Sequence, residues 1–461
     1  MQQFSPFKKT FTELTTKDLA TLRSVTEGWH IEYKREISKP DAIAKSIAAL
    51  ANTYGGWIFY GVTEESKENS VAGDFPGTEL ASADADLQKI RQAVSAHLNP
   101  ACHFDIKLLP GPCEEIGLLE GRCIICVTVP QSIEAPHVHK RGVIYRRVGD
   151  SSEPKEENDQ YLIEKMFQRS NTKLKEFEAW ISKDLELSEE ERDVPYLRLL
   201  ISPNLWGPPG AYSSPSVATV KTILNSRGER LSYMPFDSIY TSAQTIIARQ
   251  CVGQDPRKLT LTWKIQSDLS GEVIIPLRSF IGDAEDVAHY FRNHQHISQF
   301  TAELQKYTSK EWRIVDLSMV YSILGGIISA QRELQSGAGL TMDFYIKAKA
   351  INSWRATPFL DIQLYMEQIE RNSVPVNLTA ECVSPPGTHP STFWHIPDEN
   401  PELSNTLAAA FQTGWAFMPI AGAFGISIPD IFDHTKDEDQ NIFGQLQEAG
   451  IRASNNQAIY K

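Results

Sequence analysis

The sequence has few cysteines and no long apolar run, and both absences restrict where the protein can work. Six cysteines are spread over 461 residues, far fewer than a disulfide-linked scaffold needs. The longest apolar stretch, around residues 319–330, is about a dozen residues long, which is too short to cross a bilayer. Residues 1–9 are polar and contain no apolar signal segment. We therefore expect a reducing, cytoplasmic location.

The sequence also lacks a zinc-binding cysteine set and an excess of positive charge. Cys123 and Cys126 form a CxxC, but they lie in a run typical of a strand, and no second CxxC accompanies them. We interpret them as buried strand cysteines. Because the formal net charge is -13, a nucleic-acid partner would have to meet a local basic surface or a bound metal ion.

The composition is that of a folded protein with more than one domain. Hydrophobic residues make up 41% of the chain and charged residues 22%, so a substantial core can form. At 461 residues the chain exceeds what one core usually serves. Residues 150–157 are polar and contain a proline, which indicates a boundary. We predict a domain over residues 1–155, a helical linker over 156–190 and an α/β region over 191–461.

The first predicted domain begins with a strand, a helix and a second strand. Strand patterns cover residues 30–34 and 57–62, and a helical pattern that Asp41 can cap lies between them. This order suits an α/β or α+β unit. On the first strand Glu32 and Lys34 share one face, because alternate side chains of a strand point the same way.

Three carboxylates lie near these strands in the sequence. Glu27 precedes Glu32 by five residues, at the turn that enters the first strand, and Glu64 follows the second strand. Carboxylate oxygens are preferred ligands of Mg²⁺ and Mn²⁺, and an ammonium such as that of Lys34 can offset the charge that develops on an attacked phosphate. We predict that the three glutamates hold one divalent cation. An isolated Glu-x-Lys triplet is more often a solvated ion pair, so this prediction requires the three to converge.

The residues around these acids form an ordered set of motifs. In chain order they are Glu27-x4-Glu32-Tyr-Lys34; Ile47-Ala-Ala-Leu-Ala-Asn-Thr-Tyr-Gly-Gly-Trp-Ile-Phe-Tyr-Gly-Val-Thr-Glu-Glu65; Val127-Thr-Val-Pro130; Ala135-Pro-His137; and Ile144-Tyr-Arg-Arg-Val-Gly149. Together they resemble the Schlafen AlbA-like domain over roughly residues 15–155.

The resemblance implies a fold, a site and a substrate. The implied fold is α+β, with an N-terminal mixed sheet-and-helix domain followed by a mixed α/β region. In the nuclease members of the family, a site of three acidic residues cleaves structured RNA, notably tRNA and rRNA. Carried over to this sequence, the three acids are Glu27, Glu32 and Glu64. The third position is often aspartate in the relatives, so Glu65 is an alternative to Glu64.

Basic residues gather near the acids and on the last strands of the same domain. We predict that the following residues contact nucleic acid: Lys34, Arg35, Lys140, Arg141, Arg146 and Arg147. Such contacts would supply the local positive surface that the acidic chain otherwise lacks. A solvated strand face would explain the same charges.

Two other motifs carry weaker signals. His137 and His139 lie in a proline-containing loop without a spaced partner, so we interpret them as polar surface residues. Gly55 and Gly56 lack the lysine and the serine or threonine of a phosphate-binding loop, so Walker-type ATP binding is not supported.

Taken together, the motifs predict a divalent-metal-dependent endoribonuclease whose cofactor is Mg²⁺ or Mn²⁺. Its catalytic residues would be Glu27, Glu32, Glu64 and Lys34. Two alternatives stay open, a non-catalytic nucleic-acid-binding regulator and an ATP-binding protein. The resemblance adds a role in phage defence, with residues 191–461 as a sensor or regulatory domain. Only one lobe of the two-lobed RNA cleft of eukaryotic relatives is visible, so we expect a homodimer.

Overall fold

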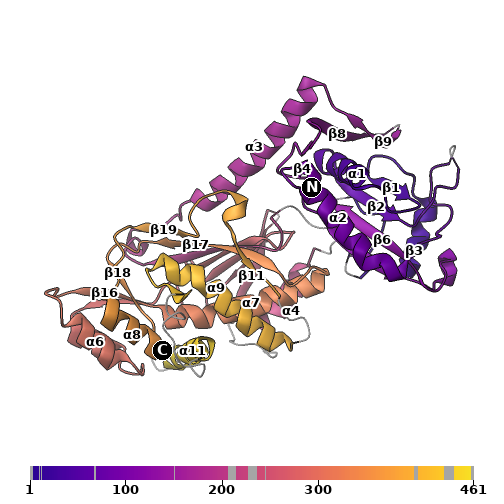
Figure 1. Cartoon of the computed structure of the whole chain (residues 1–461). Helices are drawn as coiled ribbons and strands as arrows, with labels where there is room; N and C mark the ends of the chain where they lie inside the picture. Colours follow the sequence, from indigo (N-terminus) through magenta and orange to yellow (C-terminus); the bar gives the residue numbers. More distant parts are fainter. Residues whose placement is uncertain are drawn as a thin grey trace. The chain divides into compact units, whose positions relative to one another are not determined.

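The computed structural model describes residues 4–9, 11, 13–66, 69–149, 151–205, 214–226, 236–243, 245–398, 403–429 and 441–457. Its contacts divide the chain into two compact units (Figure 1). The division falls between Ala179 and Trp180, and the short segments Asn204–Ser213 and Ala338–Leu340 count with the first unit. Both units combine helices with mixed or antiparallel sheets, so the predicted α+β class is confirmed. Within the described ranges, every helix is too short or too polar to cross a membrane.

The central sheet of unit 1 has the strand order β1-β2-β6-β3, and β5 also pairs with β6. Its strands are β1 (Ile31–Lys34), β2 (Gly56–Tyr60), β3 (Thr78–Glu79), β5 (Asp105–Pro110) and β6 (Arg122–Val129). Strands β1 and β2 are parallel, and the helix α1 (Pro40–Asn52) connects them. The strand–helix–strand beginning predicted from the sequence is therefore present.

The other elements of unit 1 form a second sheet and cover the first. They are η1 (Thr16–Ser24), η2 (Leu80–Ser82), α2 (Ala83–His97), β4 (Leu98–Asn99), η3 (Glu114–Ile116), β7 (Val138–His139), β8 (Val143–Val148), β9 (Ser151–Glu156) and α3 (Gln160–Ser182). Strands β4, β7, β8 and β9 pair in that order, all antiparallel. Helices α1 and α2 pack against each other and cover one face of the central sheet (Figure 1).

Side chains along the central strands alternate between the two faces of the sheet, and each face has its own hydrophobic core. Ile31 and Trp57 belong to the core on one face of the sheet, whereas Ile58 belongs to the core on the face that α1 and α2 cover. Because side chains alternate along β1, Glu32 points to the helix-covered face. Glu32 is only 1% exposed. The strand pattern therefore places a carboxylate in the interior of unit 1.

The passage from α1 into β2 requires glycine. Gly55 has a φ of 73° and Gly56 a φ of 153°. A Cβ added to Gly56 would lie 2.3 Å from the carbonyl oxygen of His30, so no side chain fits where the chain enters the sheet beside β1. This close approach fixes the start of β2 against the turn that leads into β1.

The helix α3 is joined to unit 1 through the side chain of Arg169. Arg169 donates to the carbonyl oxygens of Ala51, Asn52 and Thr53 at the C-terminal end of α1. A guanidinium group at this position satisfies carbonyls that have no partner within the helix. By its contacts, α3 up to Ala179 belongs to unit 1. The domain limits at residues 155 and 190 stay predictions.

Unit 2 is built on an antiparallel sheet with the order β11-β12-β13-β14-β10-β17-β19, and β20 also pairs with β17. Its strands are β10 (Tyr196–Ser202), β11 (Ser238–Ser242), β12 (Thr245–Arg249), β13 (Thr262–Ile265), β14 (Gly271–Pro276), β17 (Phe344–Ile351), β19 (Glu381–Ser384) and β20 (Trp394–Ile396). A smaller mixed sheet contains β15 (Ser279–Gly282), β16 (Trp312–Asp316) and β18 (Ala356–Phe359).

The described helices of unit 2 include one long helix, α7 (Leu317–Ala338), that is largely buried. The others are η4 (Glu189–Glu191), α4 (Val217–Asn225), α5 (Ala284–Tyr290), α6 (Ile297–Leu304), α8 (Gln363–Asn372), η5 (Pro390–Thr392), α9 (Asn405–Ala423) and α11 (Ile442–Gln457).

Candidate functional site

The predicted acids Glu27 and Glu64 are brought together by the segment that follows Glu64. This segment forms antiparallel bridges on both sides, between Thr26 and Val71 and between Glu64 and Ala72. The backbone N–H of Glu27 also donates to the carbonyl oxygen of Ser70 at 2.8 Å. Two acids that are 37 positions apart in the sequence therefore lie beside the same short stretch of backbone.

Glu27 is buried, and its two carboxylate oxygens differ in their surroundings. Oε1 accepts a long hydrogen bond of 3.4 Å from the backbone N–H of Tyr33, whereas Oε2 is buried without a hydrogen-bond partner. Burial, followed by a side-chain hydrogen bond with Glu64, raises the pKa of Glu27 to about 9. That hydrogen bond exists only while one of the two acids holds a proton. When both are ionised, a cation is needed between them.

Glu32 is also buried, but both of its carboxylate oxygens have partners. Oε1 accepts from the Ser46 hydroxyl at 2.7 Å and lies 3.0 Å from the ammonium of Lys34. Oε2 accepts from the guanidinium of Arg147 at 3.1 Å. Two cations and a hydroxyl therefore stabilise this carboxylate in the interior.

Arg147 is fully buried, which corrects its predicted role in nucleic-acid contact. Besides Glu32, its guanidinium donates to the carbonyl oxygens of Gly28 and Ile31. A side chain whose donors are used inside the protein is not available to a phosphate. Arg147 instead orients Glu32 and the turn between Glu27 and β1.

Lys34 links the acids electrostatically. Its side chain is 32% exposed, so the ammonium reaches solvent. Burial lowers the pKa of Lys34, but the charge of Glu32, its hydrogen bond with Glu32 and the charge of Glu27 outweigh that effect and raise the pKa above its usual value. The structure thus brings Glu27, Glu32, Glu64 and Lys34 into one coupled cluster, which we call the glutamate cluster.

The glutamate cluster fits a divalent cation in part. The unpaired Oε2 of Glu27 and the neighbouring carboxylate of Glu64 provide hard oxygen ligands. Within the described residues, the ligand atoms of the three glutamates do not all lie within 4.8 Å of one another. The carboxylate of Glu32 faces Lys34 and Arg147 instead. Glu65 is exposed and accepts from Asn69, so Glu64 is the acid that approaches Glu27.

The other residues predicted to contact nucleic acid lie in different surroundings. Arg35 is exposed, whereas Arg146 forms an ion pair with Glu157. Lys140 and Arg141 are exposed too, but Lys140 lies 3.0 Å from Nε2 of His97 and Arg141 is 2.8 Å from Asp41. Of these residues, Arg35 is the one beside the glutamate cluster in the sequence.

Two exposed aromatic rings lie at the turn that carries Glu27. Trp29 is 39% exposed and Tyr54 is 53% exposed, and their ring centroids are 5.5 Å apart. Trp29 packs against Gly149 so closely that a Cβ on Gly149 would lie 2.2 Å from the indole nitrogen. Exposed aromatic rings are suitable for stacking on unpaired bases.

The structure also contains a group of metal-binding side chains that the sequence analysis missed. Asp41, His97 and His139 place their ligand atoms within 4.8 Å of one another, so they could hold a metal ion. His137 and His139 are both buried, and the prediction that they are polar surface residues is wrong. The three side chains come from α1, α2 and β7 without any local spacing motif, so no signal in the sequence joined them.

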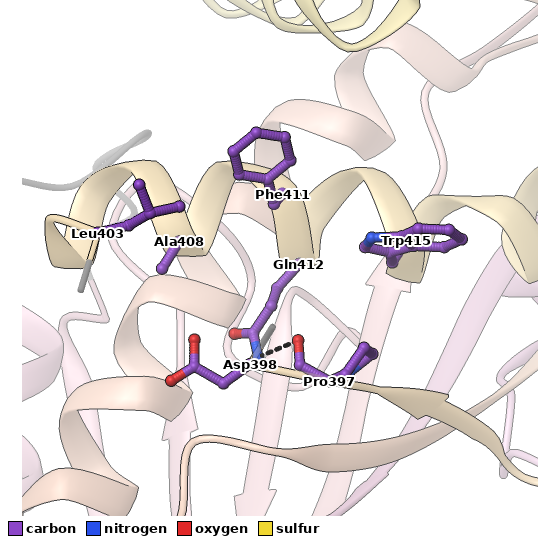
Figure 2. A pocket seen from close by; sticks show the side chains of 7 residues that line it. All are labelled: Pro397, Asp398, Leu403, Ala408, Phe411, Gln412 and Trp415. Carbon is purple, nitrogen blue, oxygen red and sulfur yellow. Dashed lines mark hydrogen bonds between the residues drawn. The ribbon is translucent and has the colours of Figure 1, made fainter. Parts of the chain in front are cut away.

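A pocket in unit 2 is lined by aromatic and polar side chains (Figure 2). Phe411, Gln412 and Trp415 come from α9. The side chain of Gln412 points toward the backbone of Pro397. Arg332 donates to both Gln412 and Asp398, and Gln412 donates to two backbone carbonyls. The side chains of Gln412 and Asp398 are therefore already engaged within the protein, and we assign the pocket no role.

Comparison with known proteins identifies the domain in unit 1. Residues 27–156 match the family model described as Schlafen, AlbA_2, so the N-terminal third of the chain contains this domain, and the family indicates a nucleic-acid-related role. A search of curated proteins finds no match. Among solved structures, the chain is similar to the DIP2311 protein from Corynebacterium diphtheriae, with 19% identity and a TM-score of 0.22. The similarity covers 36% of this chain and 35% of that one, so only about a third of that protein is spanned.

Proposed function

We propose that unit 1 is a divalent-metal-dependent endoribonuclease that cleaves structured RNA such as tRNA. The observation that carries the proposal is the buried carboxylate of Glu27, whose Oε2 has no donor and which interacts with the side chain of Glu64. Two such groups repel each other when ionised, so a proton or a cation must lie between them. The nucleic-acid-related family favours a catalytic cation such as Mg²⁺ or Mn²⁺ at this position.

In this proposal Glu27 and Glu64 hold the ion and Glu32 completes the acidic set. When bound, the ion supplies Lewis-acid activation of the phosphodiester and of the attacking hydroxyl or water. Lys34 stays partly exposed beside Glu32 and offsets charge that develops on the phosphate. Trp29 lies two residues after Glu27 and offers a ring on which an unpaired base near the cleaved bond can stack.

The decisive experiment compares two neighbouring glutamates. The purified full chain is incubated with total tRNA and Mn²⁺ or Mg²⁺, and the products are separated on a denaturing gel. Glu64→Gln should reduce the cleavage rate by more than roughly 10–100-fold, which is the loss typical when a residue that only orients a metal ligand is mutated. Glu65→Gln is the matched control, because this exposed side chain points to Asn69, and it should cut like the parent. Equal rates for the two variants would refute the proposed site.

The alternative is a non-catalytic nucleic-acid-binding regulator, and the pairing of both oxygens of Glu32 favours it. Glu32 is held by Arg147, Lys34 and Ser46 as a structural ion pair would be. Under this alternative no fragments form with either metal. Glu64→Gln then binds RNA as well as the parent or better, because it has lost a negative charge.

We also propose that the protein acts as a homodimer in phage defence, with unit 2 as the sensor or regulator. The support for this part is the Schlafen, AlbA_2 match over residues 27–156 in a chain whose second unit is compact and has its own sheets. Light scattering should give a mass near twice the 51.7 kDa of one chain. Expression of the gene should protect cells against at least one phage of a broad panel, and a Glu64→Gln gene should not.

A further inference from the structure

We propose that Asp41, His97 and His139 bind a transition-metal ion of the zinc type, at a second site that is separate from the glutamate cluster. This proposal does not depend on nuclease activity. It rests on the way three distant elements converge, on two buried imidazole nitrogens without hydrogen bonds, and on the distances among the ligand atoms. We call the three residues the Asp–His cluster.

The fold holds the three side chains of the Asp–His cluster in place independently of any ion. Asp41 is in the first turn of α1, His97 is in the last turn of α2, and His139 is on β7. Leu98, the residue after His97, pairs with His139 between β4 and β7, and the backbone N–H of Lys140 donates to the carbonyl oxygen of His97 at 2.7 Å. The two histidines are therefore fixed relative to each other by the backbone.

Two buried imidazole nitrogens face the same carboxylate oxygen without forming hydrogen bonds. His139 is 1% exposed, and its Nε2 has no hydrogen-bond partner; the same is true of the buried Nδ1 of His97. These nitrogens lie 3.5 Å and 3.9 Å from Oδ1 of Asp41. An N–H···O hydrogen bond would be about 2.9 Å long. A tetrahedral ion about 2.1 Å from each ligand would place those ligands about 3.4 Å apart, much closer to the observed distances.

Arg141 leaves Oδ1 of Asp41 available to an ion. Its guanidinium lies 2.8 Å from the other carboxylate oxygen, Oδ2, and thereby orients Asp41 with Oδ1 toward the two imidazoles. Partners behind the ligands commonly orient metal-binding carboxylates in this way. A fourth position remains for water, as in other zinc sites with three protein ligands.

The chemistry of the ligands separates the two sites. Imidazole nitrogen suits Zn²⁺ and related transition metals, whereas all-carboxylate sets suit Mg²⁺ and Mn²⁺. The competing arrangement of the Asp–His cluster has no metal. In it, each imidazole carries its proton on the nitrogen that faces Asp41, and the other nitrogen accepts from Lys140 Nζ at 3.0 Å or from the backbone N–H of Arg141 at 3.3 Å. Zinc bound to the nitrogens that face Asp41 would move the proton of each imidazole to its other nitrogen. That nitrogen of His97 could then no longer accept from the exposed Lys140.

The test measures metal binding directly on the full chain. The protein is stripped with a chelator and titrated with Zn²⁺ or Mg²⁺ in a calorimeter, using the parent, His97→Gln and Glu27→Gln. We expect the parent and Glu27→Gln to bind one Zn²⁺ with similar affinity and His97→Gln to bind it at least about tenfold more weakly. Mg²⁺ binding should be unchanged in His97→Gln. The proposal is overturned if the parent binds no Zn²⁺, if His97→Gln binds it like the parent, or if Glu27→Gln alone loses it.

A second measurement covers the case in which His97→Gln does not fold. X-ray absorption at the zinc edge of the loaded parent should show the scattering pattern of two coordinated imidazoles. A shell of oxygen ligands alone would place the ion elsewhere and refute the site. Because neither experiment reads RNA cleavage, failure here and failure of the proposed nuclease can be told apart.

Discussion

Two buried glutamates of unit 1, Glu27 and Glu32, lie five residues apart and differ in what surrounds them. Glu32 accepts hydrogen bonds on both oxygens from two cations and a hydroxyl. Glu27 has one long hydrogen bond and one buried oxygen without a donor. Burial alone does not mark a functional acid. The partners decide whether a buried carboxylate stabilises the fold or is available to bind a proton or an ion.

The largest effect should follow from breaking the ion pair of Glu32. Arg147→Met leaves the Glu32 carboxylate in the interior without its guanidinium partner, and the loss of one member of a buried pair costs about 3–5 kcal/mol. Urea unfolding monitored by circular dichroism measures this change. Arg35→Met, at the exposed position that follows β1, should change the free energy of unfolding by no more than about 0.5 kcal/mol. Similar costs for both variants would show that Glu32 is not stabilised as we describe.

The second effect concerns Glu27 and depends on pH. Its pKa in the folded protein is about 9, above the ordinary value of 4.5, so between these values the folded state holds a proton that the unfolded state has released. Without metal, stability should therefore fall as the pH rises through this window. Glu27→Gln removes this titration and should lose less stability between about pH 6 and about pH 8.5.

Added metal sharpens the same comparison. Mn²⁺ should stabilise the parent more at about pH 8.5 than at about pH 6, because the proton competes less with the ion for Glu27 as the pH approaches its pKa. Glu27→Gln should gain little at either pH. Thermal melts at the two pH values, with and without Mn²⁺, measure this. Parallel pH profiles of parent and variant would contradict the description of Glu27.

A third effect extends the comparison to the surface beside Glu27. Trp29→Ala should weaken binding of single-stranded RNA by about 1–3 kcal/mol, the usual contribution of one base stacked on an aromatic ring. Fluorescence anisotropy with a labelled oligonucleotide measures the affinity. Tyr161→Ala on α3 is the control, since this ring is 61% exposed but is not part of the turn that carries Glu27. An equal loss in the control would indicate a general surface effect.

The smallest effect distinguishes an unpaired arginine from a paired one. Arg35→Ala should reduce the dependence of log affinity on log salt by about one, because one phosphate contact is lost. Arg146→Ala should change it less, since Glu157 already neutralises that charge. Equal slopes for both variants would remove Arg35 from the predicted RNA surface.

The sequence supports predictions best where the determinants are local. The order of β1, α1 and β2 and the alternation that puts Glu32 and Lys34 on one face follow from neighbouring residues. The partner of Glu32 does not, because Arg147 lies 115 positions away and its charge alone looked like a surface contact. The roles of Glu27, Glu32, Glu64 and Lys34 stay predictions.

The Asp–His cluster shows the same limit more strongly. Its three members belong to three elements: Asp41 lies at the start of α1, His97 at the end of α2 and His139 on β7. Only the pairing of β4 with β7 and the packing of α1 on α2 brings them together. Long-range contacts of this kind leave no spacing pattern to find.

The hairpin of β7 and β8 holds His139 at one end and Arg147 at the other, so both clusters share one piece of backbone. Asn52 fastens that hairpin to the end of α1 by donating to the carbonyl oxygens of His137 and Tyr145, and Thr53 accepts from the backbone N–H of Arg147. A substitution in this hairpin is therefore felt at both ends. Mutations chosen to disturb one cluster need a readout at the other before their effects can be assigned.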